Sequence, residues 1–107
     1  MSVRELTPQQ VESDLADYHL VDVRETEELV GELGHIEGVE HVPLATLAEH
    51  AARLAEHQPL LLVCRSGRRS ENACVQLQEA GVAEVVNLAG GMIAWNEAGL
   101  PVSREAG

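Results

Sequence analysis

The sequence predicts an α/β protein in which helices cover both faces of a parallel sheet. Short apolar runs alternate with segments of helical spacing, which is the pattern of successive strand–helix units. Residues 60–64 are continuously apolar, as expected for a strand that is buried on both faces of such a sheet. The length of 107 residues fits a single domain, residues 1–107, with one core.

Five short segments are expected to form the strands. Each is short and is bounded by polar or turn-forming residues. They are residues 3–6, 19–23, 39–42, 60–64 and 85–88. Ligands of parallel α/β sheets bind beyond the carboxyl ends of the strands. Cys64 closes the strand that we expect at the centre of the sheet, so we expect the active site beside it.

The first helix has the clearest start signal in the chain. Thr7 can serve as the N-cap, Pro8 suits the first helical position, and Gln10 at the third completes a capping box. Val11 and Leu15 then lie on one face of this helix. We therefore expect a helix directly after the first strand.

Four more helices are expected along the chain. An acidic segment follows the second strand, and an apolar stripe at helical spacing precedes the fourth. These helices are residues 25–30, 44–55, 70–80 and 91–98. Gly81 ends the third of them, and Gly99 with Pro101 ends the last. We interpret the run of glutamates in residues 25–32 as a solvated face.

The charge of the chain is strongly negative but unevenly placed. Seven arginines and no lysine stand against 18 carboxylates, for a net charge of −11. This argues against nucleic acid and against an anionic membrane as partners. Three of the seven arginines lie within five residues, at Arg65, Arg68 and Arg69. Such a local positive cluster predicts an anion site.

The cysteines and the absence of a recognisable targeting pattern bear on the cellular location that we expect. No segment approaches the ~18 consecutive apolar residues of a membrane span, and the N-terminus has no basic-then-apolar signal pattern. Cys64 and Cys74 do not form the disulfide framework of small secreted domains. We therefore expect free thiols and a cytoplasmic location. Cys74 faces inward on its helix, and we expect it to be buried.

Cys64 and the residues that follow it have the composition of a thiolate site. Helix N-termini and nearby cations stabilise a thiolate, and the helix expected at Ser70 would direct its positive end at the loop. Gly67 permits a tight turn, and the backbone N–H groups of the loop can form an anion-binding nest. The loop arginines suit oxyanions because a guanidinium can bind two oxygens at once.

The length of the loop limits which anion it can hold. A Walker phosphate loop requires a lysine, and the chain has none. Cysteine phosphatases place an arginine after five intervening residues, where this chain has Ser70, with Arg69 one position early. The loop is therefore one residue short for a tetrahedral phosphate. A single transferable sulfur atom fits better.

Four separated motifs resemble the rhodanese family of sulfurtransferases in its small single-domain form. Together they cover nearly the whole chain, with Val39 standing where the family usually has alanine. The matching segments are residues 22–25 with Glu28, residues 34–39 with Pro43, residues 64–69 with Ser70, and residues 88–95 with residues 98–102.

The resemblance implies a five-stranded parallel sheet and a reaction cycle through a persulfide on Cys64. The sulfur donor would be thiosulfate or a persulfide or polysulfide, and the acceptor cyanide, a small thiol or a thiol protein. No cofactor or metal is implied. The cradle for the sulfur and the donor would consist of the loop residues Arg65, Ser66, Gly67, Arg68 and Arg69.

Other residues receive supporting or structural interpretations. Asp22 and Arg24 would form a polar brace between the end of their strand and the loop, and Ser70 would support the loop from the start of the helix. We expect His35 to have a packing role. His50 and His57 share a predicted helix but have no partner at ligand spacing, so we expect no metal site there.

Two other functions remain open from the sequence. A rhodanese-like module that senses sulfur or carries it to a protein partner would keep the same cysteine. A cysteine-dependent phosphatase or arsenate reductase would use the same thiolate, although the loop length disfavours it.

Overall fold

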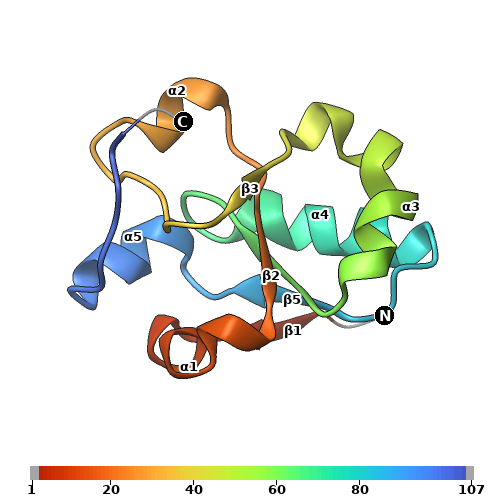
Figure 1. The fold of residues 1–107 in the computed structure, drawn as a ribbon, viewed down its shortest axis with the longest axis horizontal. Coiled ribbons are helices and arrows are strands. Elements are labelled where there is room, and N and C mark those ends of the chain that lie inside the picture. Colours follow the sequence, from red (N-terminus) through yellow and green to blue (C-terminus); the bar gives the residue numbers. More distant parts are fainter. Residues whose placement is uncertain (1–2, 106–107) are drawn as a thin grey trace.

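The computed structural model describes residues 3–105 and contains one sheet of five parallel strands (Figure 1). The order across the sheet is β1-β5-β4-β2-β3. The strands are β1 (Arg4–Leu6), β2 (His19–Asp22), β3 (Glu40–His41), β4 (Leu60–Val63) and β5 (Val85–Leu88). The predicted fold class is confirmed, and β4, which leads into Cys64, is the central strand as expected.

The central strand is buried on both faces because its side chains alternate between two cores. Leu60 and Leu62 pack into one apolar cluster, whereas Leu61 and Val63 pack into the other. All four residues have no exposed surface. This double burial explains the unbroken apolar run, since a parallel sheet covered on both sides has no solvent-facing side chains at its centre.

One face of the sheet is covered by the chain between β3 and β4 and by the long helix after β4. Its elements are the 3-10 segments η2 (Leu44–His50) and η3 (Ala55–His57) and the helices α3 (Ala51–Leu54) and α4 (Arg68–Glu79). The expected helix over residues 44–55 is therefore wrong in type: only α3 is α-helical. Leu44 and Leu47 are three apart, a spacing that suits the three residues per turn of a 3-10 helix. Cys74, which we expected to face inward, is buried together with Ala73 and Leu77.

The opposite face is covered by α1 (Pro8–Ser13), the 3-10 segment η1 (Leu15–Asp17) and α5 (Gly91–Glu97). The predicted capping box is present, with Thr7 Oγ1 accepting from Gln10 N–H at 3.2 Å and Thr7 N–H donating to Gln10 Oε1 at 2.9 Å. Trp95 is buried in this core and donates its indole N–H to the Pro101 carbonyl at 2.9 Å.

The short helix α2 (Thr26–Leu29) and the loop after it lie at the carboxyl side of β2 (Figure 1). His35 fastens this loop from two directions. Its ring Nδ1–H donates to the Leu29 carbonyl at 2.8 Å, and its backbone exchanges two hydrogen bonds with Ser103. The expected packing role of His35 agrees with these contacts. No helix within residues 3–105 has the length and apolar character needed to cross a membrane.

The helix after β4 begins two residues earlier than predicted. We expected its start at Ser70, but α4 begins at Arg68 because Gly67 is the N-cap, with a left-handed φ of 97°. A side chain would disfavour that conformation. Arg68, Arg69 and Ser70 therefore form the first helical turn, and the connection between β4 and α4 is only four residues long, from Cys64 to Gly67.

This short connection is held in place by the first turn of α5. The Met92 N–H donates to the Cys64 carbonyl at 2.8 Å, and the Ile93 N–H donates to the Arg65 carbonyl at 3.0 Å. Gly91, with φ of 57°, lies directly against this backbone. A Cβ there would stand 2.5 Å from the Cys64 oxygen. Gly91, the first residue of α5, therefore serves the 64–67 connection as well as the start of the helix.

We expect the substitution Gly91→Ala to destabilise the protein strongly. The methyl group adds a clash with the backbone of Cys64 and Arg65 to the cost of a left-handed alanine. We expect a loss of at least ~3 kcal/mol in the free energy of unfolding, measured by urea denaturation. Gly99→Ala is the matched control, because Gly99 has φ of 73° but open space around it. Equal losses in the two variants would contradict the clash.

Candidate active site

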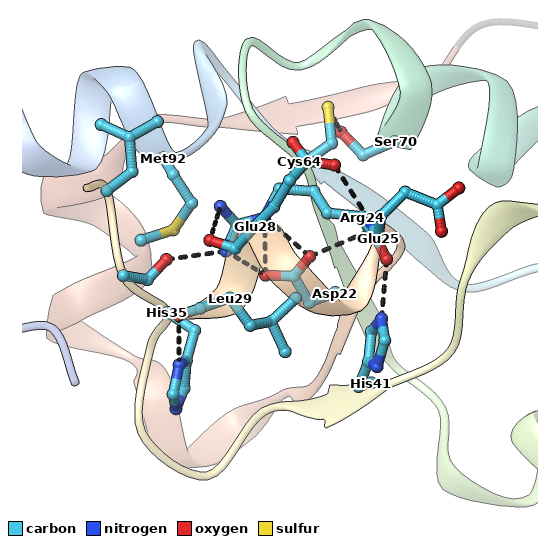
Figure 2. A network of polar contacts seen from close by, with 12 residues as sticks. Asp22, Arg24, Glu25, Glu28, Leu29, His35, His41, Cys64, Ser70 and Met92 are labelled. Carbon is cyan, nitrogen blue, oxygen red and sulfur yellow. Dashed lines mark hydrogen bonds and ion pairs between the residues drawn. The ribbon is translucent and has the colours of Figure 1, made fainter. Parts of the chain in front are cut away.

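Cys64 lies at the carboxyl end of the central strand and is buried, with 1% of its surface exposed. Its Sγ accepts a hydrogen bond from the Gly67 backbone N–H at 3.1 Å and contacts the Ser70 Oγ at 3.2 Å. Figure 2 shows Ser70 beside this sulfur atom. The structure thus brings Cys64, Gly67 and Ser70 into direct contact.

The start of α4 supplies further polarity to the sulfur. The first N–H groups of a helix have no acceptor within the helix, and the first α-helical bond here runs from the Glu71 N–H to the Gly67 carbonyl at 3.2 Å. α4 is 12 residues long, and its positive end adjoins Cys64. Helix N-termini attract anions, so this position can accommodate a negatively charged group.

The three loop arginines do not have the same environment. Arg65 and Arg68 are exposed, and neither has an ion-pair partner within residues 3–105. Arg69 instead forms a two-point pair with Glu28 of α2, with N–O distances of 2.7 and 2.8 Å. Free cations for a bound anion are therefore Arg65 and Arg68. Ser66, the remaining predicted loop residue, is also exposed.

Glu28 is not part of a solvated face, so that interpretation of the acidic run was wrong for this residue. Besides binding Arg69, its Oε1 accepts the Glu25 N–H at 3.0 Å and caps α2. The hydrogen bonds from Arg69, opposed by partial burial and aided by the Glu25 N–H, lower the pKa of Glu28 to about 2. In turn, the hydrogen bonds to Glu28 raise the pKa of Arg69.

Asp22 and Arg24 form a buried pair at the end of β2, in the centre of Figure 2. Arg24 Nη2 donates to Asp22 Oδ2 at 2.8 Å and to the Gly34 carbonyl at 2.7 Å, and Nη1 donates to the Glu28 carbonyl at 3.3 Å. The pair is therefore a brace, although not between the strand end and the 64–67 connection, where we expected it. Its hydrogen bonds hold α2 and the following segment, and the 64–67 connection receives none of them.

Cys74 has a different environment from Cys64. It is fully buried in the core beneath α4, and this burial raises the pKa of its thiol to about 12. It forms no disulfide. These observations agree with the predicted core position of Cys74, and at neutral pH its thiol stays protonated.

His50 and His57, which we expected on one helix, lie in the separate segments η2 and η3 and have separate contacts. His50 Nδ1 is 3.1 Å from Arg53 Nη2, whereas the His57 ring stacks on His19 with 4.8 Å between centroids. No set of three His, Cys, Asp or Glu side chains in the described part of the chain is arranged to hold a metal ion.

Asn87 is a residue of the site that the sequence analysis missed. It lies in β5 with no exposed surface. Its side chain hydrogen-bonds to Ser70, to the Gly67 carbonyl and to Glu5 of β1. The available signal was a single amide within an otherwise apolar buried strand, since a buried amide requires partners for both its oxygen and its nitrogen.

A cavity of about 210 Å³ opens next to the loop, between the brace and Arg65. Both positive and negative side chains line it. Its lining consists of Arg24, Glu28, Gly31, Glu32, Leu33 and Arg65. Because Asp22 already pairs with Arg24, the guanidinium of Arg65 is the unpaired positive group at this cavity.

The fold and the site define a class: a parallel α/β protein with a cysteine held at the end of the central strand by the N-terminus of the next helix. Comparison with known proteins agrees. Residues 7–98 match the family model described as the rhodanese-like domain. The chain belongs to this family, whose relatives include proteins named sulfurtransferases and sulfur carriers.

Individual relatives give the same family and fold. A putative sulfur carrier protein of Bacillus subtilis is 40% identical over 87 residues, which are 81% of this chain and 45% of that protein. This chain thus spans less than half of that relative. A thiosulfate sulfurtransferase of Vibrio cholerae is 31% identical over 84 residues, 78% of this chain and 77% of that protein.

Solved structures share the fold. A rhodanese-related protein from Thermoplasma volcanium superposes with a TM-score of 0.84 at 28% identity, covering 95% of this chain and 99% of that one. The similarity extends over both chains almost completely, so the arrangement of the sheet and its helices is that of rhodanese-like proteins.

The Glu28–Arg69 pair predicts a pH dependence of stability. The pKa of Glu28 is lowered from 4.5 to about 2 in the folded protein, so its contribution is complete above pH ~4.5 and is lost as the pH falls towards ~2. Both side chains are about one-third exposed, which limits the pair to ~0.5–1 kcal/mol. We expect Glu28→Gln to lower the free energy of unfolding by this amount at neutral pH and to match the original protein near pH 2.

Urea denaturation across this pH range measures the effect. The amide oxygen introduced by Glu28→Gln can still accept the Glu25 N–H, so the helix cap is kept. Glu27→Gln, an exposed change on the same helix, is the control and should not alter the pH profile. A difference between Glu28→Gln and the original protein that stays constant down to pH 2 contradicts the assignment.

Proposed function

We propose that this protein is a sulfurtransferase that carries a sulfane sulfur as a persulfide on Cys64. The observation that carries the proposal is the position of the Cys64 Sγ, which accepts the Gly67 N–H at 3.1 Å at the N-terminus of α4. The same donors can stabilise a thiolate before the reaction and a persulfide after it.

The proposed cycle has two displacements. The Cys64 thiolate attacks the outer sulfur of thiosulfate; the new S–S bond forms as the bond to the inner sulfur breaks, and sulfite leaves with the electron pair. A cyanide or thiolate acceptor then attacks the outer sulfur of the persulfide, which leaves thiocyanate or a new persulfide and restores the Cys64 thiolate. No oxidant or reductant is consumed. Persulfides and polysulfides are alternative donors.

Burial of the nucleophile supports a small transferred group. Cys64 is 1% exposed, so a terminal sulfur atom can reach it more readily than a tetrahedral centre surrounded by oxygens. The engagement of Arg69 by Glu28 also disfavours a phosphatase or arsenate reductase, since Arg69 is the arginine nearest to the position that surrounds the anion in those enzymes, and it is already paired.

We assign binding of the donor's charged end to Arg65 and Arg68. Both are exposed beside the loop without a carboxylate partner among the described residues, and Arg65 lines the adjoining cavity. Ser66 and Gly67 contribute the backbone of the cradle. Arg69 has a different role in this proposal: together with Glu28, it fastens α4 to α2. Asp22, Arg24 and Ser70 support the site without binding the donor.

A sulfur-carrier function is a second candidate. The similarity to a putative sulfur carrier protein, of which this chain spans 45%, favours it. A thiol protein would then be the acceptor, and turnover with cyanide would be slow beside transfer to that protein. The relative named thiosulfate sulfurtransferase favours the enzyme and its donor. The cytoplasmic location stays a prediction, in keeping with two free cysteines.

Intact-protein mass spectrometry after incubation with thiosulfate tests the persulfide. We expect the protein to gain one sulfur atom and the Cys64→Ser variant to gain none, because serine cannot form a persulfide. Cys74→Ser is the matched control and should gain the sulfur as the original protein does. Sulfur that maps to Cys74, or none on any cysteine, contradicts the proposal.

Steady-state assays separate the enzyme from its alternatives. For a thiosulfate sulfurtransferase, we expect thiocyanate production to fall at least ~100-fold in Cys64→Ser. We expect Arg65→Ala to raise the KM for thiosulfate more than it lowers kcat, since its proposed role is to bind the donor. Efficient hydrolysis of an aryl phosphate by the original protein would contradict both the loop-length argument and the role given to Arg69.

A further inference from the structure

The side chain of Asn87 hydrogen-bonds to both residues that, within residues 3–105, hydrogen-bond to the sulfur of Cys64. Its Nδ2 donates to the Gly67 carbonyl at 3.0 Å, and its Oδ1 accepts from the Ser70 hydroxyl. Gly67 and Ser70 are the two residues hydrogen-bonded to Cys64 Sγ. One buried amide on β5 therefore positions both hydrogen-bond partners of the Cys64 sulfur.

The orientation of this amide follows from its partners. Nδ2 faces the Gly67 carbonyl and the Glu5 carboxylate, the latter at 2.9 Å, and both groups only accept hydrogen bonds. The amide nitrogen must point at these two acceptors, which directs Oδ1 at Ser70. Ser70 has a single hydroxyl proton, and Oδ1 can only accept, so this proton is directed to Asn87.

This arrangement determines what Ser70 offers to Cys64. With its proton on the side of Asn87, the Ser70 oxygen presents a lone pair to Sγ at 3.2 Å, and a Cys64 thiol can donate into it. A thiolate has no proton to donate. To stabilise a thiolate, the Ser70 hydroxyl must rotate towards Sγ, which leaves the Oδ1 of a fully buried Asn87 without its partner.

We propose that Asn87 is a positioning residue that directs the Ser70 hydroxyl away from Cys64 and thereby sets the pH at which this cysteine becomes a thiolate. When Cys64 ionises, its thiol proton leaves to water. The Ser70 hydroxyl proton only rotates between two acceptors, so no covalent bond of Ser70 or Asn87 is broken. The relevance of this inference to sulfur transfer rests on the proposed function of Cys64. The midpoint of thiolate formation can be measured whether or not that function is correct.

Charged groups on several elements surround this arrangement. Arg69 of α4 is paired with Glu28 of α2, and Asp22 beside them is paired with Arg24. A second group consists of the exposed loop arginines Arg65 and Arg68 and of Glu5, which contacts Asn87 from β1. The substitutions below change no charge, so these influences remain the same in all variants that are compared.

The test is a pH titration of the thiolate absorbance of Cys64 in the ultraviolet, with the Cys64→Ser protein as the baseline. Asn87→Leu keeps the branched outline of the side chain and removes both polar atoms. We expect its midpoint to lie about 0.5–1 pH unit below that of the original protein, a three- to tenfold gain in thiolate at a given pH, because Ser70 is then free to donate to Sγ.

The Ser70→Ala background shows whether Asn87 acts through Ser70. We expect Ser70→Ala and the double variant Ser70→Ala/Asn87→Leu to have the same midpoint, since the hydroxyl that Asn87 orients is absent from both. Asn96→Leu removes an amide that is bonded to the Leu33 and Met92 carbonyls and not to Gly67 or Ser70, and it should leave the midpoint unchanged. Circular dichroism and thermal unfolding confirm that each variant is folded, and Asn87→Ala replaces the leucine variant if that one does not fold.

Two results overturn the inference. The first is an unchanged or higher midpoint in folded Asn87→Leu. The second is an equal change with and without Ser70, which indicates a general disturbance of the loop. Failure of the proposed function is seen separately, because a protein that takes up no sulfur from thiosulfate can still show the Ser70-dependent change in midpoint.

Discussion

The path of the chain from β4 into α4 depends on its contact with the first turn of α5. Two N–H groups of that turn bind the Cys64 and Arg65 carbonyls, and Gly91 allows the backbones to approach closely. The Gly67 N–H that donates to the sulfur belongs to the same four-residue connection. A helix near the end of the sequence therefore fixes the backbone around Cys64, near its middle.

The sequence predicted the positions of the strands better than the environment of the site. Continuous apolar runs and the Thr7 capping box are local signals, and they placed the strands and the start of α1 correctly. The early start of α4 depends on the left-handed conformation of Gly67, and the interaction of Gly91 with Cys64 depends on packing between segments 27 residues apart. The sequence motifs contain Gly67 and Gly91, but they do not indicate which backbone segments these glycines contact.

The polar partners of the site show the same limit. Asp22 and Arg24 were predicted as a brace from their position after a strand, yet their partners on the 28–34 segment could only be seen in three dimensions. Glu28 was hidden within an acidic run, because nothing in its local sequence indicates that Arg69, 41 residues later, lies opposite. Clustered arginines thus predicted an anion site, whereas the folded chain determines that Arg65 and Arg68 are the unpaired members.

The separation of the two cysteines has a consequence for oxidative chemistry. A protein that forms an internal disulfide during oxidation needs a second thiol that can reach the first as a thiolate. Cys74 is buried in the core with a pKa of about 12, so it cannot take this role at neutral pH. A sulfenic acid formed on Cys64 must therefore be reduced by a thiol from solution or from another protein. The same outside thiols would compete to remove a stored sulfur.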